Sequence, residues 1–427
     1  MMRTDRRGFL KASTAAAGAV VMDQVVSGAD PSRPLQMGVI GVGWYGMVDA
    51  LAALKVGGVR VAAVCDVDSE HLKNAADELE KKQASRPETF KHYQELLDVE
   101  SLDVVVIATP PHWHALQLLA AIERKKDVYC EKPVAYDVRE GQAMVEAVNA
   151  SDRIVQVGFQ RRQSAALRQA AEFIASGGIG KLVQVDAQIH YHAALLDPTP
   201  QAPPESLDWE LWCGPGPRIP YSPQVGHKSW RLEKTSGHGH LVDWGIHLID
   251  AIRTMLGLGM PKQVTAAGGI YHYAGGITTP DTLSAHFEFE GLPVHWRHRL
   301  WGSTEYEPAL SNGIFFFGTE GTVFAADRTW TVIRRGKEGA REEHDAPADL
   351  GRLHMADFLD AVRTRRKPSC TIGDGFQSTA TVQLAMIALE TGSTVRWDAK
   401  TLQVLDNPAA AALLRREYRP DWVHPFG

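Results

Sequence analysis

The sequence contains few cysteines, and no two of them have a Cys-x-x-Cys spacing. This absence argues against a zinc site and a disulfide framework, so we expect four buried thiols at Cys65, Cys130, Cys213 and Cys370. Long apolar runs are also missing, since none reaches the roughly 18 residues that a membrane-spanning helix needs. The chain is therefore not expected to insert into a membrane.

Basic residues are not in excess either. The formal charge of the 427-residue chain is −6 at pH 7, and it becomes −8 without residues 1–29, which carry four basic and two acidic residues. A protein with a net negative charge is not expected to bind nucleic acid or an anionic membrane surface. With 44% hydrophobic and 22% charged residues, the composition is that of a globular protein, and the length favours two domains.

Residues 1–29 differ from the rest of the chain in composition. Arg6 and Arg7 precede a weakly apolar stretch that ends at Val26, and Ser27-Gly28-Ala29 offers small residues for cleavage. This order is typical of a twin-arginine export signal, which predicts a periplasmic or otherwise exported protein. A basic, alanine-rich tail without a targeting role is the alternative interpretation.

The most informative stretch begins at Leu35. Its apolar run ends in Gly41-x-Gly43-x-x-Gly46, the fingerprint of a dinucleotide-binding turn between a strand and a helix. Gly41 permits the tight turn, Gly43 lets the backbone approach a pyrophosphate, and Gly46 lets the helix pack closely on the strand. The phosphates would bind at the helix N-terminus, where free N–H groups and the helix dipole favour anions.

Asp66 stands where such a fold holds the adenosine ribose. The predicted strand 59–65 delivers this carboxylate 20 residues after Gly46. A carboxylate there accepts hydrogen bonds from the ribose diol and repels a 2′-phosphate, so the spacing favours NAD over NADP. A solvated aspartate that opens a loop before Asp68 is the alternative interpretation.

The pattern from residue 35 to 155 alternates strand and helix, which predicts a Rossmann-type, doubly wound parallel sheet. The apolar strand 102–109 is followed by Pro110-Pro-His-Trp-His114, and Glu131-Lys132-Pro133 follows the next strand. Ligands bind at the carboxyl ends of the strands in such a sheet. Lys132 is therefore expected to face the same crevice as the cofactor.

Residues 156–395 follow a different pattern, and we assign them to an α+β domain with a large open, mainly antiparallel sheet. A helix at 164–176 comes first, and the expected strands are 182–191, 283–289, 294–300, 313–317 and 322–326. The proline-rich stretch 198–223 is a long loop of the functional kind. Helices at 352–365 and 374–391 are expected to lie against the first domain, and residues 396–427 form a C-terminal extension.

Four polar residues recur at helical spacing in the apolar stretch 239–250, and they are His240, Asp243, His247 and Asp250. This spacing places them on one face of a helix, where a buried polar stripe needs partners or a cleft. Three interpretations remain open: core side chains satisfied by hydrogen bonds, an acid/base pair, or a metal site. Four in-line ligands on one helix cannot surround an ion, so we assign no metal.

Together these motifs resemble the Gfo/Idh/MocA oxidoreductase family. The resemblance covers nearly the whole chain after the signal and rests on four motifs: the glycine fingerprint with Asp66, Thr109-Pro110 with His114, Glu131-Lys132-Pro133, and Asp243-x-x-x-His247-x-x-Asp250. The loop 209–231 and the ending 418–422 are similar to the exported branch of the family. His238 and His240 depart from the family pattern, which leaves the exact substrate open.

The resemblance implies Lys132 and His247 as a catalytic pair, with Asp243 orienting the imidazole. It implies NAD as the cofactor, held by Gly41, Gly43, Trp44, Tyr45, Gly46, Asp66, Thr109, Pro110, His114, Glu131, Lys132, Gln160 and Arg161. Substrate contacts are expected from Arg161, His238, His240 and His247. Family members commonly use the open sheet for contacts between subunits, so we expect a homo-oligomer, a dimer or a tetramer.

The residue types agree with the implied chemistry. Hydride loss from the carbon of a sugar hydroxyl needs a base for the O–H proton and a cation beside the forming oxygen anion. Neutral His247 can be the base, and Lys132 can be the cation. A salt bridge in the crevice for Lys132 and a hydrogen bond from helix to sheet for His247 are the structural alternatives.

Three functions compete at this point. The first is an NAD-dependent oxidoreductase that acts on a carbohydrate hydroxyl and keeps NAD tightly bound in a redox-neutral cycle, because little free NAD is expected outside the cytoplasm. The second is an NAD-dependent glycosidase or lyase that works by transient oxidation and elimination. The third is a non-catalytic sugar- or NAD-binding protein, which would have no need for Lys132, Asp243 and His247.

Overall fold

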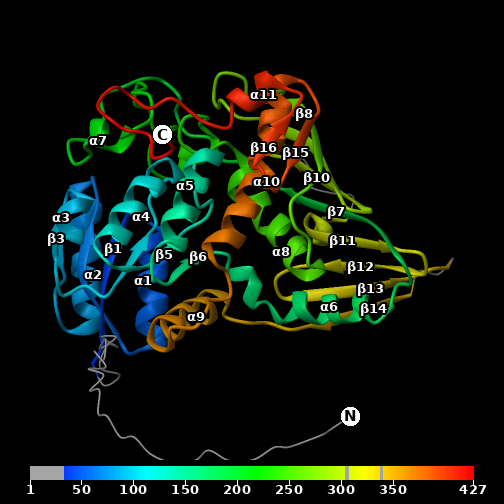
Figure 1. Cartoon of the computed structure of the whole chain (residues 1–427), viewed down its shortest axis with the longest axis horizontal. Helices are drawn as coiled ribbons and strands as arrows, with labels where there is room; N and C mark the ends of the chain where they lie inside the picture. Colours follow the sequence, from blue (N-terminus) through cyan, green and yellow to red (C-terminus); the bar gives the residue numbers. More distant parts are fainter. Residues whose placement is uncertain (1–32, 303–306, 337–339) are drawn as a thin grey trace, which may run out of the picture.

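Two sheets organise the chain (Figure 1), as the sequence predicts. The structure is a computed structural model that describes residues 33–302, 307–336 and 340–427. The predicted export signal, including Arg6 and Arg7, lies outside the described residues. Among the helices that are described, none is long and apolar enough to cross a membrane. The four cysteines are buried and free, as expected.

The first sheet contains, within the described residues, six parallel strands in the order β3-β2-β1-β4-β5-β6. These strands are β1 (Leu35–Ile40), β2 (Val59–Cys65), β3 (Glu88–Phe90), β4 (Val104–Ile107), β5 (Asp127–Cys130) and β6 (Val155–Val157). The apolar runs of β1, β4 and β5 are almost fully buried, as parallel strands between two helical layers require. The strand order reverses between β1 and β4, and such a switch point is where ligands bind.

Helices cover both faces of this sheet (Figure 1). One face carries α1 (Tyr45–Val56), α2 (Ser69–Gln83) and α9 (Leu350–Thr364) in a shared apolar cluster. The opposite face carries α3 (Tyr93–Leu97), α4 (His114–Glu123) and α5 (Val138–Asn149). The position of α9 against α1 confirms that the helix predicted at 352–365 lies on the first domain, although it follows most of the second domain in sequence.

The second sheet contains ten strands within the described residues, in the order β14-β13-β12-β11-β7-β10-β9-β8-β15-β16. The strands are β7 (Leu182–His190), β8 (Gln263–Gly269), β9 (Thr282–Phe289), β10 (Leu292–Arg299), β11 (Asn312–Gly318), β12 (Gly321–Ala325), β13 (Thr329–Arg334), β14 (Arg341–Asp345), β15 (Val395–Asp398) and β16 (Gln403–Leu405). β7 and β10 pair in parallel, and the other pairs are antiparallel. The predicted mainly antiparallel sheet is confirmed.

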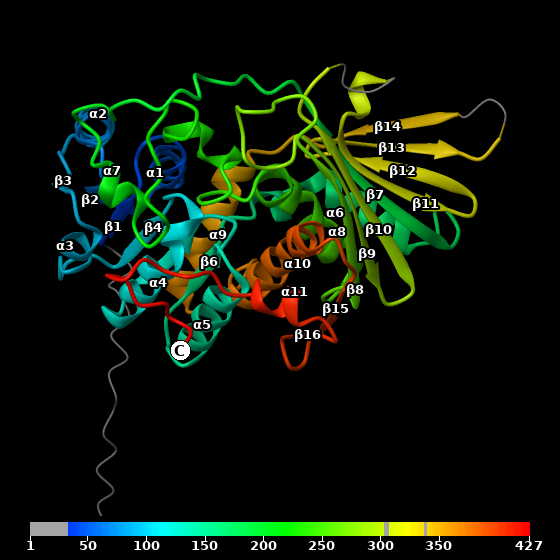
Figure 2. The same cartoon turned by 90° about the horizontal axis from the view of Figure 1, so that it is seen from above.

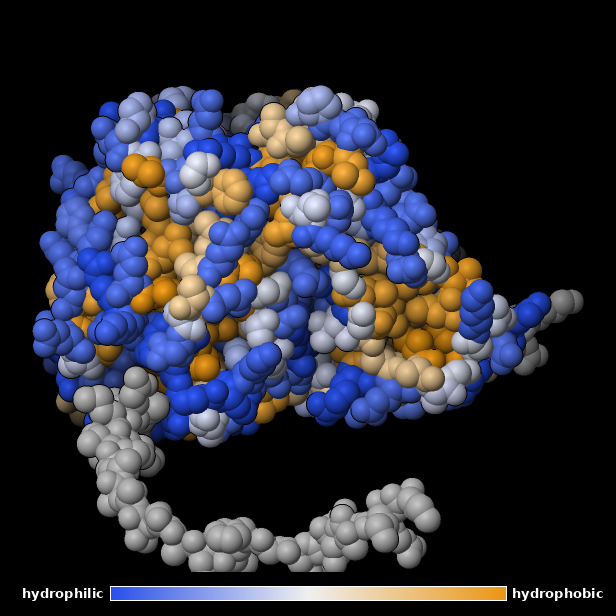
Figure 3. Space-filling model, viewed as in Figure 1, coloured by the Kyte–Doolittle hydropathy of each residue, from blue (hydrophilic) through white to orange (hydrophobic). Residues whose placement is uncertain are grey.

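Helices pack on one side of the second sheet (Figure 2). They are α6 (Ala165–Ala175), α8 (Ile246–Leu256) and α10 (Ile372–Thr391), and α10 also contacts α5 of the first domain. Side chains alternate along β9 accordingly, with Leu283 buried and Ser284 exposed. The surface over β7, β11 and β12 is apolar (Figure 3), which is typical of a contact between subunits. The homo-oligomer stays a prediction.

The structure moves one predicted domain border. β15 and β16 belong to the second sheet, so the C-terminal extension begins at residue 406 and not at 396. This extension, here called the C-terminal tail (residues 406–427), contains α11 (Pro408–Ala412) and then returns to the first domain. Arg416 lies 2.6 Å from Glu140 of α5, and His424 lies 3.1 Å from Asp137. The sequence border was wrong because two short strands after a long helix carry no separate pattern.

A long segment between β7 and α8, residues 191–240, runs back over the first domain, and we call it the covering loop. It contains α7 (Trp209–Cys213) and a 3-10 turn at His227–Leu232. Other 3-10 turns occupy Pro111–Trp113, Gln160–Gln163 and Pro308–Leu310. The Ser69 N–H donates to the Ser206 carbonyl oxygen at 2.9 Å, and the Asp208 N–H donates to the Val67 carbonyl oxygen at 3.1 Å. The covering loop is therefore fastened beside the carboxyl end of β2.

Candidate active site

The glycine turn after β1 has the geometry that its sequence predicts. Gly41 adopts a left-handed conformation with φ +88°, and a Cβ there would lie 2.8 Å from the carbonyl carbon of Ala108. A Cβ on Gly46 would lie 1.9 Å from the carbonyl oxygen of Gly41. Side chains are therefore excluded at both positions, and the start of α1 is held against the ends of β1 and β4.

A cavity of about 510 Å³ lies against this turn at the carboxyl ends of β1, β2 and β4. The predicted cofactor residues that line it are Gly41, Gly43, Trp44, Tyr45, Asp66, Thr109 and Pro110. Its volume is in the range of pockets that bind a cofactor or another small molecule. The cavity therefore lies at the sheet edge and switch point where the sequence placed the dinucleotide.

Asp66 is oriented by the turn that it faces. Its Oδ2 accepts a hydrogen bond from the Val42 N–H at 2.8 Å, and its Oδ1 accepts one from the Asp68 N–H at 3.0 Å. Burial raises the pKa of Asp66, and these two hydrogen bonds act in the opposite direction by stabilising the carboxylate. Each oxygen has a second lone pair, so the carboxylate can still accept hydrogen bonds from a ribose diol.

Lys132, Asp243 and Arg231 form a charged centre beside the cavity. Lys132 Nζ donates to Asp243 Oδ1 at 2.9 Å and to the Asp243 carbonyl oxygen at 2.8 Å. Arg231 Nε lies 2.9 Å from Asp243 Oδ2, and Arg231 also lines the cavity. Burial acts to raise the pKa of Asp243, but the two cations outweigh this effect and lower it. The ammonium group of Lys132 is thus fixed by two acceptors from the second domain.

The prediction that Asp243 orients His247 is wrong, because no hydrogen bond joins the two side chains in the described part of the chain, and the Asp243 carboxylate pairs with Lys132 and Arg231. Nδ1 of His247 is buried without a hydrogen-bond partner, and its ring packs edge-on against Phe159 at a centroid distance of 6.0 Å. Burial, followed by the charges of Lys132 and Arg161, lowers the pKa of His247 well below its ordinary value. Its imidazole is therefore neutral near pH 7, which is the form that can accept a proton.

A π-helical turn at Leu241–Gly245 explains this difference from the predicted regular helix. Its hydrogen bonds join residues five apart, so the 3.6-residue periodicity does not hold between Asp243 and His247. Asp250, farther along α8, lies 2.7 Å from Arg162 Nη2 in an ion pair of its own. The predicted polar stripe is therefore divided between the charged centre and the core.

Glu131 and Gln160 support the backbone beside Lys132 and do not line the cavity. Glu131 Oε1 accepts a hydrogen bond from Gln160 Nε2 at 2.7 Å, and Oε2 accepts one from the Lys132 N–H at 3.2 Å. Burial raises the pKa of Glu131 to about 7. Glu131 and Gln160 thus position the backbone of Lys132, and their direct contact with the cofactor stays a prediction.

His114 and Arg161, like Lys132 and His247, are not among the residues that line this cavity, and their contacts with cofactor and substrate stay predictions. The two ring nitrogens of His114 lie 2.8 Å from the Pro133 carbonyl oxygen and 2.7 Å from the Thr109 carbonyl oxygen. His114 thereby joins the loops after β4 and β5. Arg161 Nε lies 2.8 Å from Asp327 Oδ1 in the second domain. Nη1 of Arg161 is buried without a hydrogen-bond partner, and the charge of Arg161 acts on His247, so this residue stays a candidate for a contact with a ligand.

The predicted substrate site required His238 and His240 to lie on one surface, but the structure separates them. His238 has φ +59°, its ring lies 4.2 Å from that of Tyr136, and it lines a second cavity of about 430 Å³. His240 is buried, and its ring lies 5.0 Å from the rings of both Tyr191 and His298. The left-handed backbone at His238 turns this side chain toward the first domain, which sequence spacing does not reveal.

The covering loop and the C-terminal tail supply cavity residues that the sequence analysis missed, namely Trp212, Tyr221, Trp230, Arg231 and Trp422. Trp422 meets Trp113 edge-on at a centroid distance of 5.0 Å, and the Arg231 guanidinium lies 5.1 Å from the ring centre of Trp44. The tryptophan-rich, proline-rich composition signalled a functional loop. Which strand edge it covers is decided by packing between distant parts of the chain.

The residues present fit NAD. Gly41 and Gly46 leave no room for a Cβ, which matches the tight turn and close helix packing of a dinucleotide fold, Gly43 lines the cavity where a pyrophosphate would approach, and the Asp66 carboxylate matches a ribose diol. The aromatic side chains of the covering loop form the opposite wall of the same cavity. The charged centre at Lys132 then lies next to the bound cofactor.

Family models match three segments of the chain. They describe residues 35–159 as the NAD-binding Rossmann fold of an oxidoreductase family, 212–324 as a Gfo/Idh/MocA C-terminal domain, and 335–424 as an oxidoreductase-family C-terminal alpha/beta domain. The chain therefore belongs to the Gfo/Idh/MocA oxidoreductase family, and its first domain is an NAD-binding Rossmann domain. The resemblance found in the sequence, and NAD as its cofactor, are confirmed.

Individual relatives agree with this assignment. Inositol 2-dehydrogenase of Salmonella typhimurium is 35% identical over 182 residues, which are 42% of this chain and 52%, or about half, of that enzyme. The 1,5-anhydro-D-fructose reductase of Ensifer adhaerens is 28% identical over 309 residues, 70% of this chain and 81% of that enzyme. The solved structure of levoglucosan dehydrogenase with NADH and levoglucosan has a similar fold, with a TM-score of 0.67 and 20% identity over 85% of this chain and 99% of that chain.

Proposed function

We propose that the chain is an NAD-dependent oxidoreductase that acts on a carbohydrate hydroxyl and keeps NAD bound through a redox-neutral cycle. The site supports the chemistry, because the fixed ammonium group of Lys132 lies near enough to the neutral imidazole of His247 to influence its pKa. The relatives named above act, by their names, on inositol and on an anhydro sugar, which supports a polyhydroxylated substrate. The sugar and the hydroxyl are left to experiment.

When bound, NAD can accept a hydride from the substrate carbon and return it. The residues of the chain handle the proton and the developing charge. His247 accepts the hydroxyl proton on its neutral imidazole, and Lys132 stabilises the oxygen as negative charge develops on it. Asp243 positions Lys132, because its carboxylate and carbonyl oxygens both accept hydrogen bonds from Nζ.

The redox-neutral part of the proposal rests on the covering loop and the C-terminal tail, which both line the cofactor cavity. The covering loop is fastened to the first domain through Ser206 and Asp208, and the C-terminal tail adds Trp422 to the wall. The covering loop and the tail therefore contact a dinucleotide in this cavity from the side opposite the glycine turn, and these contacts slow its release. Slow exchange of the cofactor favours return of the hydride within the same cycle.

The predicted export signal supports the same proposal. The twin-arginine route carries folded proteins, so NAD bound in the cytoplasm can leave the cell inside the fold. Free NAD is scarce outside the cytoplasm, and an enzyme that released NADH there would stop after one turnover. Retention of the cofactor removes this restriction.

Turnover without added NAD tests the proposal. The purified protein is incubated with a panel of sugars and nitrophenyl glycosides, and product and NADH are measured separately. Repeated turnover by the wild-type protein, with no net NADH, is expected. His247→Asn serves as the matched inactive control, because it keeps a polar side chain of similar size and loses the base.

Each result assigns one of the competing functions. Conversion of one sugar into another without net NADH is the expected result, and release of nitrophenol without net NADH would assign the chain to glycosidases. A need for millimolar NAD, with NADH formed in proportion to product, would contradict the retained cofactor. Absence of turnover on every sugar that binds would favour a binding protein.

A further inference from the structure

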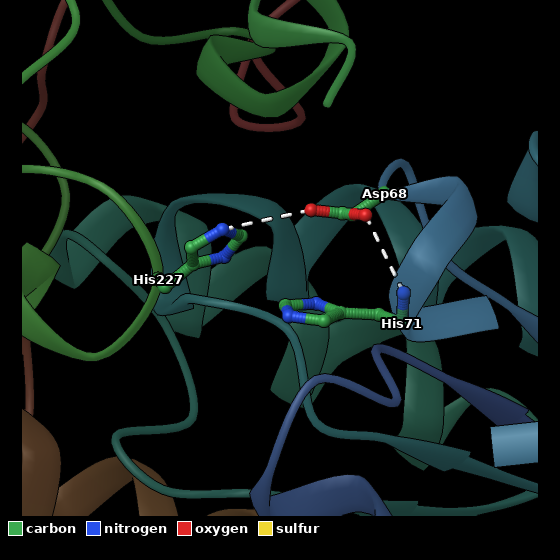
Figure 4. A group of neighbouring side chains, drawn as sticks. All are labelled: Asp68, His71 and His227. Carbon is green, nitrogen blue, oxygen red and sulfur yellow. Dashed lines mark hydrogen bonds and ion pairs between the residues drawn. The ribbon is translucent and has the colours of Figure 1, made fainter. Parts of the chain in front are cut away.

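Three side chains that line the cofactor cavity lie close together, and they are Asp68, His71 and His227 (Figure 4). Asp68 and His71 belong to the first domain at the start of α2, whereas His227 lies on the covering loop. One potential ligand atom of each residue lies within 4.8 Å of those of the other two. The hydride chemistry proposed above uses none of them.

The geometry of these side chains suits a transition-metal ion. Asp68 Oδ2 lies 3.5 Å from His227 Nε2, close to the roughly 3.4 Å that separates two ligands in a tetrahedral zinc site. Asp68 Oδ1 accepts a hydrogen bond from the Glu70 N–H at 2.9 Å, which fixes the carboxylate and leaves Oδ2 for an ion. The ring centres of His71 and His227 lie 4.5 Å apart, and one nitrogen of His71 lies within 4.8 Å of the ligand atoms of Asp68 and His227.

The electrostatic surroundings favour a cation at this position. The carboxylates of Asp68 and Asp66 both interact electrostatically with His227. His227 has φ +47°, a conformation that few residues other than glycine adopt, and this backbone holds the ring toward Asp68.

His71 also lies against the glycine turn. A Cβ on Gly43 would lie 2.8 Å from His71 Nδ1, so the imidazole stands beside the backbone that a pyrophosphate approaches. Zinc sites with three protein ligands keep a fourth position for a ligand from outside the protein. A phosphate oxygen of the cofactor is the ligand that this position would meet.

We propose that Asp68, His71 and His227 bind one Zn²⁺ ion, which joins the covering loop to the first domain and accepts a pyrophosphate oxygen of NAD as its fourth ligand. The ion holds the covering loop closed and slows the release of NAD. The claim that the ion slows NAD release rests on the proposed function. The sequence analysis assigned no metal, because the ligands come from segments far apart in the chain and follow no ligand spacing.

Zinc binding is measured on the purified full-length chain after treatment with a chelator and dialysis. Titration calorimetry is expected to give one Zn²⁺ per chain with a Kd of about 1 µM or tighter. Co²⁺ in place of Zn²⁺ is expected to give the absorption bands of tetrahedral cobalt.

Two variants and one control locate the site. His71→Ala and His227→Asn should each weaken Zn²⁺ binding about tenfold or more, since each removes one of three ligands. Asparagine tolerates the left-handed backbone at position 227, so this variant keeps the loop conformation. His92→Ala removes another histidine that lines the same cavity and should leave Zn²⁺ binding unchanged.

Retention of the cofactor is the second readout. NAD release from zinc-loaded wild-type protein should be about tenfold slower than from chelator-treated protein, and His227→Asn should abolish this difference. Absence of stoichiometric Zn²⁺, or equal Zn²⁺ affinity in wild type and both variants, would overturn the inference. So would faster NAD release from the variants with no dependence on zinc, because the histidines would then act on the pyrophosphate directly. If zinc binds as expected but NADH accumulates with product, the proposed function is contradicted and the zinc site is not.

Discussion

Asp243 Oδ1 lies 2.9 Å from Lys132 Nζ, and this ion pair joins the two domains at the reacting centre. Oδ2 of the same carboxylate lies 2.9 Å from Arg231 Nε of the covering loop. One buried carboxylate thus fixes a cation from the first domain and another from the cover of the cofactor cavity. Closure of the cover and orientation of Lys132 consequently depend on the same residue.

Asp243→Asn should lower kcat by about 100-fold or more, which corresponds to roughly 3 kcal/mol of barrier. The amide keeps the shape of the side chain but loses the charge that holds the ammonium group of Lys132. Steady-state kinetics on the substrate found in the turnover screen measure the effect.

Asp250→Asn is the matched control for this variant. Asp250 lies on α8 and is as deeply buried, but its ion pair is with Arg162 and not with Lys132. Both variants should unfold at lower urea concentration, because each removes a buried ion pair. Only Asp243→Asn should lose kcat, and an equal loss of kcat in both would assign Asp243 to stability alone.

Lys132→Ala and His247→Ala should each abolish turnover while NAD stays bound, at a cost of about 3 to 5 kcal/mol of barrier. The first variant removes the cation beside the oxygen, and the second removes the base. Since burial lowers the pKa of His247, wild-type kcat should stay constant as pH falls through 6.5, the ordinary pKa of histidine. Full activity of either variant would remove that residue from the mechanism.

His354 should make the stability of the fold depend on pH. Burial lowers its pKa to about 4, whereas an unfolded histidine has a pKa of about 6.5. As pH falls below 6.5 the unfolded state gains a proton that the folded state does not, so stability is lost, by about 2 kcal/mol at pH 5.

The variant His354→Gln isolates this contribution. Glutamine can still donate a hydrogen bond to the Val157 carbonyl oxygen, which lies 2.9 Å from His354 Nε2. Urea unfolding at neutral pH and at about pH 5 should show a smaller loss of stability for the variant, by about 2 kcal/mol. Equal losses in both proteins would show that His354 is protonated in the folded state.

Asp66→Ala should weaken NAD binding and reduce the discrimination against NADP. The ribose diol loses an acceptor, and a 2′-phosphate loses the charge that repels it. Titration of both cofactors into the variant measures the ratio of their affinities. The same loss of affinity for NAD and NADP would contradict the role of Asp66 at the ribose.

The glycine turn and Asp66 were predictable from the sequence because local rules fix them. The tight turn after β1 excludes a Cβ at Gly41, and the topology of a parallel sheet brings the end of β2 beside it. Lys132 follows the same rule, since it comes directly after β5. The residues at the carboxyl ends of these strands could therefore be predicted from the spacing of motifs in the sequence.

The partner of Asp243 could not be predicted in this way. A π-helical turn changes the register within one segment, and 3.6-residue periodicity contains no signal for it. Arg231 reaches Asp243 from a loop whose path depends on packing against the first domain. His238 points away because its backbone is left-handed. Each of these differences arises from tertiary packing, which spacing along the chain does not encode.

The central claim is that NAD stays in the cavity through purification and catalysis. Mass spectrometry of the small molecules released by denaturing the extensively dialysed protein tests it most directly. We predict about one NAD or NADH per chain, from protein that has never received added cofactor. Protein that releases no dinucleotide, and that binds NAD only at millimolar concentration, would contradict the account.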